Sequence, residues 1–375
     1  MKKPRIVGVL VGDVVHEAGA RVKYGHFFDA LKQHFPLVTV HDTTLQGMDR
    51  WLNALMTIHP DRRRWRERFY KNVPAFQRRS QRVSAFVKSL SEEVDLVLQV
   101  GVLFQTYTSL PTIIYTDYTS QLSAQKPASG RSPFTPEERR AWISQERSAL
   151  VKADHIFTRG EFVRQAIVAD YGVAGERITA VGGGVNFADL PTVAPVPAGP
   201  PTALFIGKEL YRKGGDLLLH AFAQARRQVP NARLLMLTGD TIPDDLPLAG
   251  VELIEPTWDR TAVAKLYQRA HFFVLPSRLE TWGDVFLEAM AYGLPCLGVN
   301  DDAMSEIIDH EQNGLIVPPE DVNGLAQALV RLFTEQTQRQ QWGTAARHKV
   351  EGQYTWAQVV AQMAPTIQRV CQVND

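Results

Sequence analysis

The chain has 375 residues, of which 45% are hydrophobic and 22% charged, and its formal net charge is +1. This length favours two domains over a single core, and the near-neutral charge gives no global field that would select nucleic acid. No apolar stretch is long enough to span a bilayer. The two cysteines, Cys296 and Cys371, lack metal-ligand spacing, so we expect them to be reduced, as in a cytoplasmic protein.

Short apolar runs alternate with longer helical patterns along the whole chain. The start, MKKPRIVGVLVGDVV, has a basic head, but no small-residue cleavage pattern follows, so we interpret it as a first core strand rather than a signal peptide. Most of the runs are continuously apolar, which favours parallel strands buried on both faces by helices. The predicted strands are 6–11, 37–40, 96–100, 112–115, 156–158, 178–181, 203–206, 233–237, 252–254, 272–275, 296–299 and 315–317.

A proline-rich segment, FADLPTVAPVPAGPPT at 187–202, separates the two halves. Its five prolines, Pro197 among them, cannot sustain a helix or an inner strand, so an extended linker is predicted. Alternation of strands and helices on either side of it predicts an α/β protein of two Rossmann-like, doubly wound domains. Ligands of such sheets bind at the carboxyl ends of the strands, so the predicted site is a cleft between the domains.

The run PSRLETWGDVFLEAMAYGLPCLG at 276–298 combines a strand exit, a loop and a helix start. If the helix begins near Asp284, the amides of Gly283, Asp284 and Val285 point out of its N-terminus and form an anion site. Gly283 would let a phosphate approach closely. The alternative is that Gly283 is only a turn glycine.

Two carboxylates, Glu280 and Glu288, lie in the same run. A carboxylate accepts two hydrogen bonds and fits a vicinal diol such as that of ribose. Glu288 stands in an apolar helix, FLEAMAYGL, where an unpartnered carboxylate is costly. The alternative for Glu288 is a structural pair with a buried arginine.

A second motif, FIGKELYRKGGDLLLHAF at 205–222, places basic residues after a predicted strand that ends at Gly207. Lys208, Arg212 and Lys213 precede a glycine-rich helix start, an arrangement that suits a diphosphate. Each charge-assisted contact to phosphate contributes roughly 1.5–3 kcal/mol. The alternative is a solvated basic loop.

Taken together, these motifs resemble the donor-nucleotide domain of the retaining glycosyltransferases of family 4, which have the two-domain GT-B fold. The matching stretches are ALFIGKELYRKGGDLLLHAF, VLPSRLETWGDVFLEAMAYGLPCLG and MSEIIDHEQNGLIVPPEDVNGLAQAL. Earlier, ADHIFTRGEFVRQAIVADYGVAGERITAVGGGVN resembles the segment that closes the family's first domain. The resemblance implies a first domain at 1–190, a donor domain at 200–354, and a C-terminal helix at 355–375 that packs back on the first domain.

The resemblance also implies roles for individual residues. Lys208 and Lys213 would bind the donor diphosphate, Glu280 would contact the donor sugar or phosphate, and Glu288 would hold the ribose hydroxyls. The implied donor-binding residues are Gly19, Gly207, Lys208, Lys213, Glu280, Trp282, Gly283, Asp284, Val285 and Glu288. The implied catalytic residues are Asp117, Glu280, Lys208 and Lys213.

The sequence departs from the family pattern at several positions. Lys208 replaces the usual arginine, so a bidentate fork becomes a point charge. Gly183 stands where asparagine is commoner. Asp117 occupies the place of a histidine that faces the donor sugar, which puts its proton-handling role in doubt and leaves an Asx turn as the alternative. The first loop has Gly12 and Gly19 rather than an adjacent glycine pair.

The function that the resemblance implies is retaining transfer of a hexosyl group from a UDP- or GDP-sugar to an acceptor hydroxyl. The leaving phosphate would take the acceptor's proton, so no carboxylate nucleophile is demanded, unlike in retaining glycosidases. No metal or other cofactor is expected, since no DxD-type cluster stands in a suitable loop. The alternatives are a nucleotide-sugar 2-epimerase and a non-catalytic nucleotide-sugar-binding protein. A nicotinamide dehydrogenase is disfavoured because no GxGxxG follows the first strand.

The stretch 61–82, DRRRWRERFYKNVPAFQRRSQR, holds nine basic and two acidic residues with aromatic residues between them. One interpretation is peripheral docking on anionic lipid at the inner membrane face. A second is a site for a lipid-linked or anionic acceptor. Nucleic acid is a poorer third, because no recognition fold accompanies the patch. The remaining alternative is a solvated helix whose aromatic side chains pack on the core.

Overall fold

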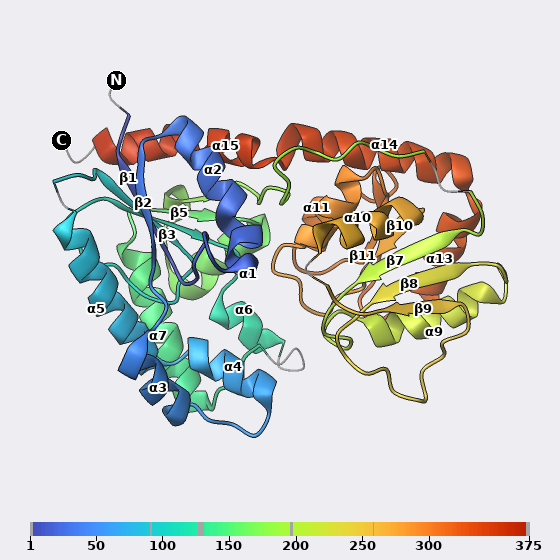
Figure 1. The fold of residues 1–375 in the computed structure, drawn as a ribbon, viewed down its shortest axis with the longest axis horizontal. Helices are drawn as coiled ribbons and strands as arrows, with labels where there is room; N and C mark the ends of the chain where they lie inside the picture. The colour runs from blue at the N-terminus through green and yellow to red at the C-terminus, as the bar shows by residue number, and fades with distance from the viewer. Residues whose placement is uncertain (1–2, 91, 127–130, 196–197, 258, 373–375) are drawn as a thin grey trace. The chain divides into compact units, whose positions relative to one another are not determined.

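The computed structural model describes residues 3–90, 92–126, 131–195, 198–257 and 259–372. The chain divides into two compact units, Met1–Asn186 with Trp356–Asp375, and Phe187–Thr355. Each unit is a parallel six-stranded sheet with helices on its faces (Figure 1). All of the predicted strands are present within two residues of their expected bounds. The expected doubly wound α/β class is therefore confirmed.

The first unit has the strand order β2-β1-β3-β4-β5-β6. Its strands are β1 Ile6–Leu10, β2 Leu37–Asp42, β3 Leu96–Val100, β4 Thr112–Thr116, β5 His155–Thr158 and β6 Ile178–Ala180. Its helices are α1 Ala18–Ala20, η1 Arg21–Gly25, α2 His26–His34, α3 Gly47–Met56, α4 Arg62–Tyr70, α5 Val73–Ser89, α6 Ser120–Gln125, α7 Pro136–Lys152, α8 Glu161–Ala166, η3 Ile167–Tyr171, η4 Gly175–Arg177 and α15 Trp356–Gln372. Strands β1 and β3 are buried along their whole length, as expected for parallel strands covered on both faces.

Helix α15 completes the core of the first unit. It lies beside α2 (Figure 1), and its Trp356 ring is 5.2 Å from the ring of Phe27, centroid to centroid. A Cβ at Gly184 would lie 2.5 Å from the Trp356 ring, so the glycine-rich end of the motif AVGGGVN admits this helix. Each large apolar side chain buried here contributes about 1.5–3 kcal/mol.

The second unit has the strand order β12-β11-β10-β7-β8-β9. Its strands are β7 Thr202–Ile206, β8 Arg233–Leu237, β9 Val251–Ile254, β10 Phe272–Val274, β11 Cys296–Val299 and β12 Gly314–Val317. Its helices are α9 Gly215–Arg226, α10 Arg260–Arg269, α11 Asp284–Ala291, α12 Met304–Ile307, α13 Val322–Thr334 and α14 Gln336–Gln353. The chain runs outward from β7 to β8 and β9, then returns to β10 on the other side of β7. The loops that follow β7 and β10 therefore flank a topological switch point, where ligands of such sheets bind.

The predicted linker belongs to the second unit. Its described residues before β7, 187–195 and 198–201, form neither helix nor strand, and Pro197 lies outside the described residues. Cys296 is a buried thiol and Cys371 is a half-buried one. In the described part of the chain, no helix combines the length and apolar character needed to cross a membrane.

Candidate functional site

The loops that follow β7 and β10 meet in the second unit because the two strands are parallel neighbours. The ammonium of Lys213 contacts the carboxylate of Glu280, and their side chains are 12% and 8% exposed. The loops touch directly at Gly214, whose φ of 69° suits glycine. A Cβ there would lie 1.9 Å from the carbonyl oxygen of Pro276, so no other residue fits this contact.

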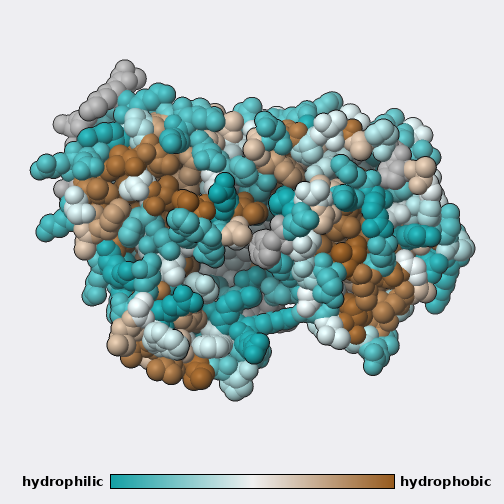
Figure 2. Space-filling view, in the orientation of Figure 1, coloured by the Kyte–Doolittle hydropathy of each residue, from teal (hydrophilic) through white to brown (hydrophobic). Residues whose placement is uncertain are grey.

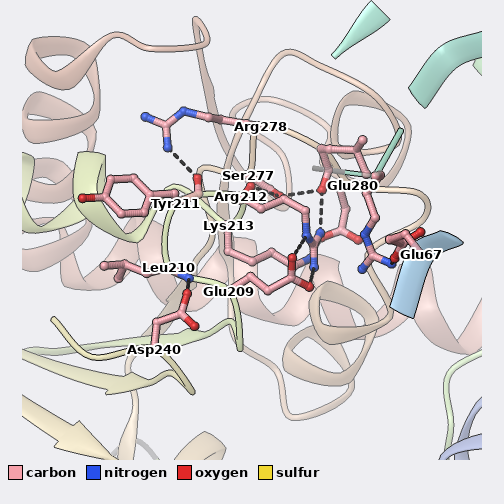
Figure 3. A network of polar contacts seen from close by, with 12 residues as sticks. Glu67, Glu209, Leu210, Tyr211, Arg212, Lys213, Asp240, Ser277, Arg278 and Glu280 are labelled. Carbon is pink, nitrogen blue, oxygen red and sulfur yellow. Dashed lines mark hydrogen bonds and ion pairs between the residues drawn. The ribbon is translucent and has the colours of Figure 1, made fainter. Parts of the chain in front are cut away.

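Two arginines brace these loops, each holding the backbone of the other loop (Figure 3). Arg212 donates from Nη1 to the carbonyl oxygen of Leu279 at 3.0 Å. Arg278 donates from Nη1 to the carbonyl oxygen of Tyr211 at 2.5 Å, and its amide donates to the carbonyl of Arg212 at 2.9 Å. The residues next to Lys213 and Glu280 are thus fixed by reciprocal hydrogen bonds.

The same arginines are held by carboxylates. Arg212 donates to both carboxylate oxygens of Glu209 at 3.0 and 3.1 Å. Arg278 makes a two-pronged contact with Asp216 at 2.7 and 2.9 Å, and a second one with Glu320. The hydrogen bonds that Arg278 donates to Asp216, then those to Glu320, raise the pKa of Arg278 despite its partial burial. Such forks fix orientation as well as charge, which makes both arginines positioning residues.

No role was predicted for Arg278, and only a generic basic one for Arg212. Both stood in the quoted motifs. However, spacing along the chain does not reveal that each would reach the backbone of the other loop.

The predicted loop-to-helix transition at Gly283 is confirmed. Gly283 caps α11 with φ 90°, and its carbonyl accepts the first helical bond from the amide of Phe286 at 2.8 Å. Asp284 and Val285 form the first turn and are half-buried. The positive end of this helix therefore begins three residues after Glu280.

Glu288 is buried in α11 and already has partners. Its carboxylate is 3.1 Å from Nη2 of Arg260 and accepts a hydrogen bond from the Tyr267 hydroxyl at 3.1 Å. Burial raises the pKa of Glu288, although the charge of Arg260 opposes this shift. An arginine pair was the structural alternative for Glu288; the Arg260 side chain, however, is 40% exposed rather than buried.

The remaining second-unit candidates lie around this cluster. A Cβ at Gly207 would lie 2.8 Å from Cβ of Lys213, so Gly207 leaves room for the lysine stem. Lys208 is exposed on the same loop. The ring of Trp282 is buried and packs edge-on against Tyr354 with centroids 5.6 Å apart.

The first-unit candidates form a separate charged cluster at the carboxyl ends of its strands. Asp117 follows β4, and its carboxylate accepts a hydrogen bond from Nζ of Lys23, on η1, at 2.9 Å. Burial alone would raise the pKa of Asp117, but the charges of Lys23 and Arg159 outweigh it and hold that pKa well below its usual range. Asp117 is therefore an ionised, ion-paired carboxylate, which makes it a weak proton acceptor.

Lys23 and Arg159 were not among the predicted site residues. Arg159 directly follows β5 and is buried, with its guanidinium 5.8 Å from the ring centroid of Tyr115 and 5.7 Å from that of Trp356. Its position after a predicted strand was a usable signal. Gly19 lies half-buried in α1, just before η1, whereas Gly12 donates its amide to Asp42 at 2.8 Å.

A cavity of about 360 Å³ lies elsewhere in the second unit. Its walls come from Val193–Pro195, α10, the turn at Tyr292–Pro295 and α14, and they include none of the predicted site residues. Over the described ranges, no group of three or more His, Cys, Asp or Glu side chains is arranged to hold a metal ion.

Comparisons with known proteins show what this chain is similar to. Residues 188–349 match the family model described as "Glycosyl transferases group 1". The glycogen synthase of Mycobacterium tuberculosis is 28% identical over 233 residues, which are 60% of this chain and 55% of that protein. A mannosyltransferase of the same species, named GDP-mannose-dependent alpha-(1-6)-phosphatidylinositol monomannoside mannosyltransferase, is 30% identical over 178 residues, 44% of this chain and 46% of that protein. The chain thus spans about half the length of these relatives.

Solved structures extend the likeness to both units. Sucrose-phosphate synthase from Thermosynechococcus elongatus superimposes with a TM-score of 0.70 and 18% identity, covering 99% of this chain and 100% of that one. The fold is therefore GT-B, as the resemblance implied. The matches support a glycosyltransferase, and the cluster at β7 and β10 lies within the matched residues.

Proposed function

We propose that this protein is a retaining glycosyltransferase that moves a hexosyl group from a nucleoside-diphosphate sugar to an acceptor hydroxyl. One observation carries the proposal. Lys213 and Glu280 are in contact at the switch point of the second sheet, and Glu280 lies three residues before Gly283, the N-cap of α11. A cation, a carboxylate and a positive helix end at one strand edge suit a ligand that carries both phosphates and hydroxyls.

In the proposed mechanism, the negative charge that develops on the leaving diphosphate is the main charge to stabilise. Lys213 would exchange part of its contact with Glu280 for a phosphate oxygen, and Lys208 would approach from solvent. The amides of Gly283, Asp284 and Val285 would accept the distal phosphate. Glu280, released from the lysine, would then face the transferred sugar.

Glu288 would hold the ribose hydroxyls. Its carboxylate accepts a hydrogen bond from Tyr267 and pairs with the half-exposed Arg260, so a shift of that arginine would free a lone pair for a ribose hydroxyl. In the first unit, we propose that Asp117 orients Lys23 and does not take a proton, because its pKa is so low. The diphosphate itself would take the acceptor's proton.

The donor and acceptor are further parts of the proposal. A relative is named as GDP-mannose-dependent, so GDP-mannose is a first donor to test beside UDP-sugars. The acceptor would be lipid-linked or anionic. No metal or other cofactor would be required, since Lys213 and the helix amides supply positive charge at the diphosphate.

A donor panel tests the function. Thermal stabilisation and slow hydrolysis would be measured with UDP-, GDP- and ADP-sugars for the wild type, Lys213→Ala and Glu288→Ala, with Arg269→Ala as an exposed control in the same unit. We expect one donor to stabilise the wild type and the control but neither site variant. Epimerised donor without transfer would favour the epimerase, and binding without turnover would favour a non-catalytic protein. No binding of any nucleotide sugar would refute the site.

A further inference from the structure

Helix α3 of the first unit is amphipathic, but its apolar face is exposed to solvent instead of packing on the core. Met48, Trp51, Leu52 and Leu55 follow one another at spacings of three, one and three, which places them on one face. That face lies in solvent, with 74% of Met48, 71% of Trp51 and 65% of Leu55 exposed. Ile58, just beyond the helix, is 70% exposed. Figure 2 shows a hydrophobic surface where Figure 1 places α3.

The inner face of α3 is polar and firmly attached. Asn53 is fully buried, donates from Nδ2 to the carbonyl oxygen of Phe69 at 2.8 Å, and accepts from Nδ2 of Asn72 at 2.9 Å. The indole of Trp65 donates to the carbonyl of Ala54 at 3.2 Å. Rotating α3 to bury its apolar face would break these bonds, so the exposure of that face is built into the fold.

The basic stretch 61–82 separates into two parts in the structure. From residue 68 onward most of its basic residues are engaged within the unit, for example Arg68 with Glu138, Lys71 with Glu67, and the buried Arg79 with the carbonyl of Tyr70, whereas Arg82 is exposed. Its earlier members lie on α4, whose N-terminus is capped by Asp61. The exposed arginines of α4 are Arg62, Arg63, Arg64 and Arg66.

We propose that the apolar face of α3 and the exposed arginines of α4 form one surface that docks on a membrane containing anionic lipid. The apolar side chains would enter the boundary between headgroups and acyl chains, where Trp51 suits the interface. The arginines, separated from α3 by only a short connection, would contact anionic headgroups. This inference concerns the first unit and is independent of the proposed transfer reaction.

Charge favours lipid over a second copy of this chain. A two-fold contact between α3 faces would bring the arginines of both copies close together, where like charges repel. A bilayer with anionic headgroups instead pairs the apolar face with acyl chains and the arginines with phosphates.

Co-sedimentation of the full chain with vesicles tests the proposal. Vesicles of phosphatidylcholine alone would be compared with vesicles that also contain phosphatidylglycerol. We expect binding to the anionic vesicles only. The double variant Trp51→Ser/Leu55→Ser and the triple variant Arg62→Gln/Arg63→Gln/Arg66→Gln should each weaken binding at least about tenfold. Leu253→Ser and Arg269→Gln, exposed in the second unit, serve as controls and should bind like the wild type.

Three outcomes overturn the proposal. The first is equal binding of the wild type and both the α3 and α4 variants, and the second is no binding to anionic vesicles. The third is concentration-dependent dimerisation that Trp51→Ser/Leu55→Ser abolishes, which would assign the surface to a second copy. Circular dichroism confirms that the variants fold, and donor-induced thermal stabilisation reports on the second unit separately, so failure here does not bear on the transfer reaction.

Discussion

Lys213 and Glu280 form an ion pair although 67 residues separate them in the chain. The contact exists because β7 and β10 are parallel neighbours, so the loops that follow them leave the same edge of the sheet. The pair is largely buried, and a buried charge without its partner costs several kcal/mol. The ion pair in the proposed donor site therefore also holds the two loops together.

Removing the lysine should affect both properties. Lys213→Ala is expected to lower the turnover number roughly 10²- to 10³-fold, as for the loss of one stabilising donor in an active site. It should also lower the melting temperature, because Glu280 is left buried without its cation. The double variant Lys213→Met/Glu280→Gln should recover stability but not turnover. Recovery of turnover in the double variant would contradict the role of Lys213 in transfer.

The contact at Gly214 should tolerate no side chain. Gly214→Ala is expected to destabilise the protein by more than about 2 kcal/mol, since a Cβ would collide with the carbonyl of Pro276. Gly172 is a matched control, because its φ of 71° is nearly the same and no atom lies within 4 Å of its Cβ position. Gly172→Ala should cost only about 1 kcal/mol of backbone strain. Calorimetric melting of both variants checks the difference.

The bracing role of Arg278 should depend on its planar guanidinium group, which donates to several acceptors at once. Arg278→Lys keeps the charge but cannot serve Asp216, Glu320 and the Tyr211 carbonyl together, so we expect donor affinity to fall about tenfold and the melting temperature to drop. Arg269, which pairs with Glu252 at the surface, is the control, and Arg269→Lys should change neither quantity. Titration calorimetry with the donor measures the affinity. Similar affinities of Arg278→Lys and Arg269→Lys would show that Arg278 does not support donor binding.

His155 predicts a pH dependence of stability in the first unit. Burial, with smaller contributions from Arg369 and Arg177, lowers the pKa of His155 to about 4. Between pH 6.5 and 4, His155 is protonated in the unfolded chain but stays neutral in the folded one. The free energy of unfolding therefore decreases as the pH falls, by at most about 1.4 kcal/mol per pH unit. His155→Gln can still bond Thr179 and should flatten this dependence. Urea unfolding of the wild type and the variant at pH 7 and pH 5 measures this dependence. The same loss of unfolding free energy in both proteins would exclude His155 as the cause.

Metal removal should leave the reaction intact. If Lys213 and the α11 amides neutralise the diphosphate, treatment with EDTA should change the transfer rate by less than about twofold. Transfer rates before and after chelation, and after adding back Mg²⁺ or Mn²⁺, check this expectation. A rate that collapses with EDTA and returns with one metal would show that a cation performs part of this role.

Much of the fold was predictable because parallel buried strands leave a strong pattern. Runs such as Leu96–Val100, Arg233–Leu237 and Cys296–Val299 match their predictions residue for residue. The contact between Lys213 and Glu280 follows from the order of the strands, and a helix begins after Gly283, where one was expected. The bracing by Arg212 and Arg278 was not, since it depends on how two loops approach in space.

The same limit explains the basic stretch and α3. Composition indicated that 61–82 was unusual, but not that Arg79 turns inward while Arg62 and Arg66 remain exposed. For α3, the spacing of Met48, Trp51 and Leu55 looks like the inward face of an ordinary helix. Only the buried polar contacts of Asn53 show that the helix is turned the other way.

The placement of α15 has a consequence for biosynthesis. The first unit is built from Met1–Asn186 and Trp356–Asp375, so the ribosome makes the whole second unit before it makes the helix that covers Phe27 and Tyr115. During that interval the nascent first unit exposes apolar surface, a state prone to aggregation. The second unit, by contrast, is continuous in sequence and can fold first. The second unit would thus complete its fold before the first unit, although the first unit begins earlier in the chain, because α15 is made last.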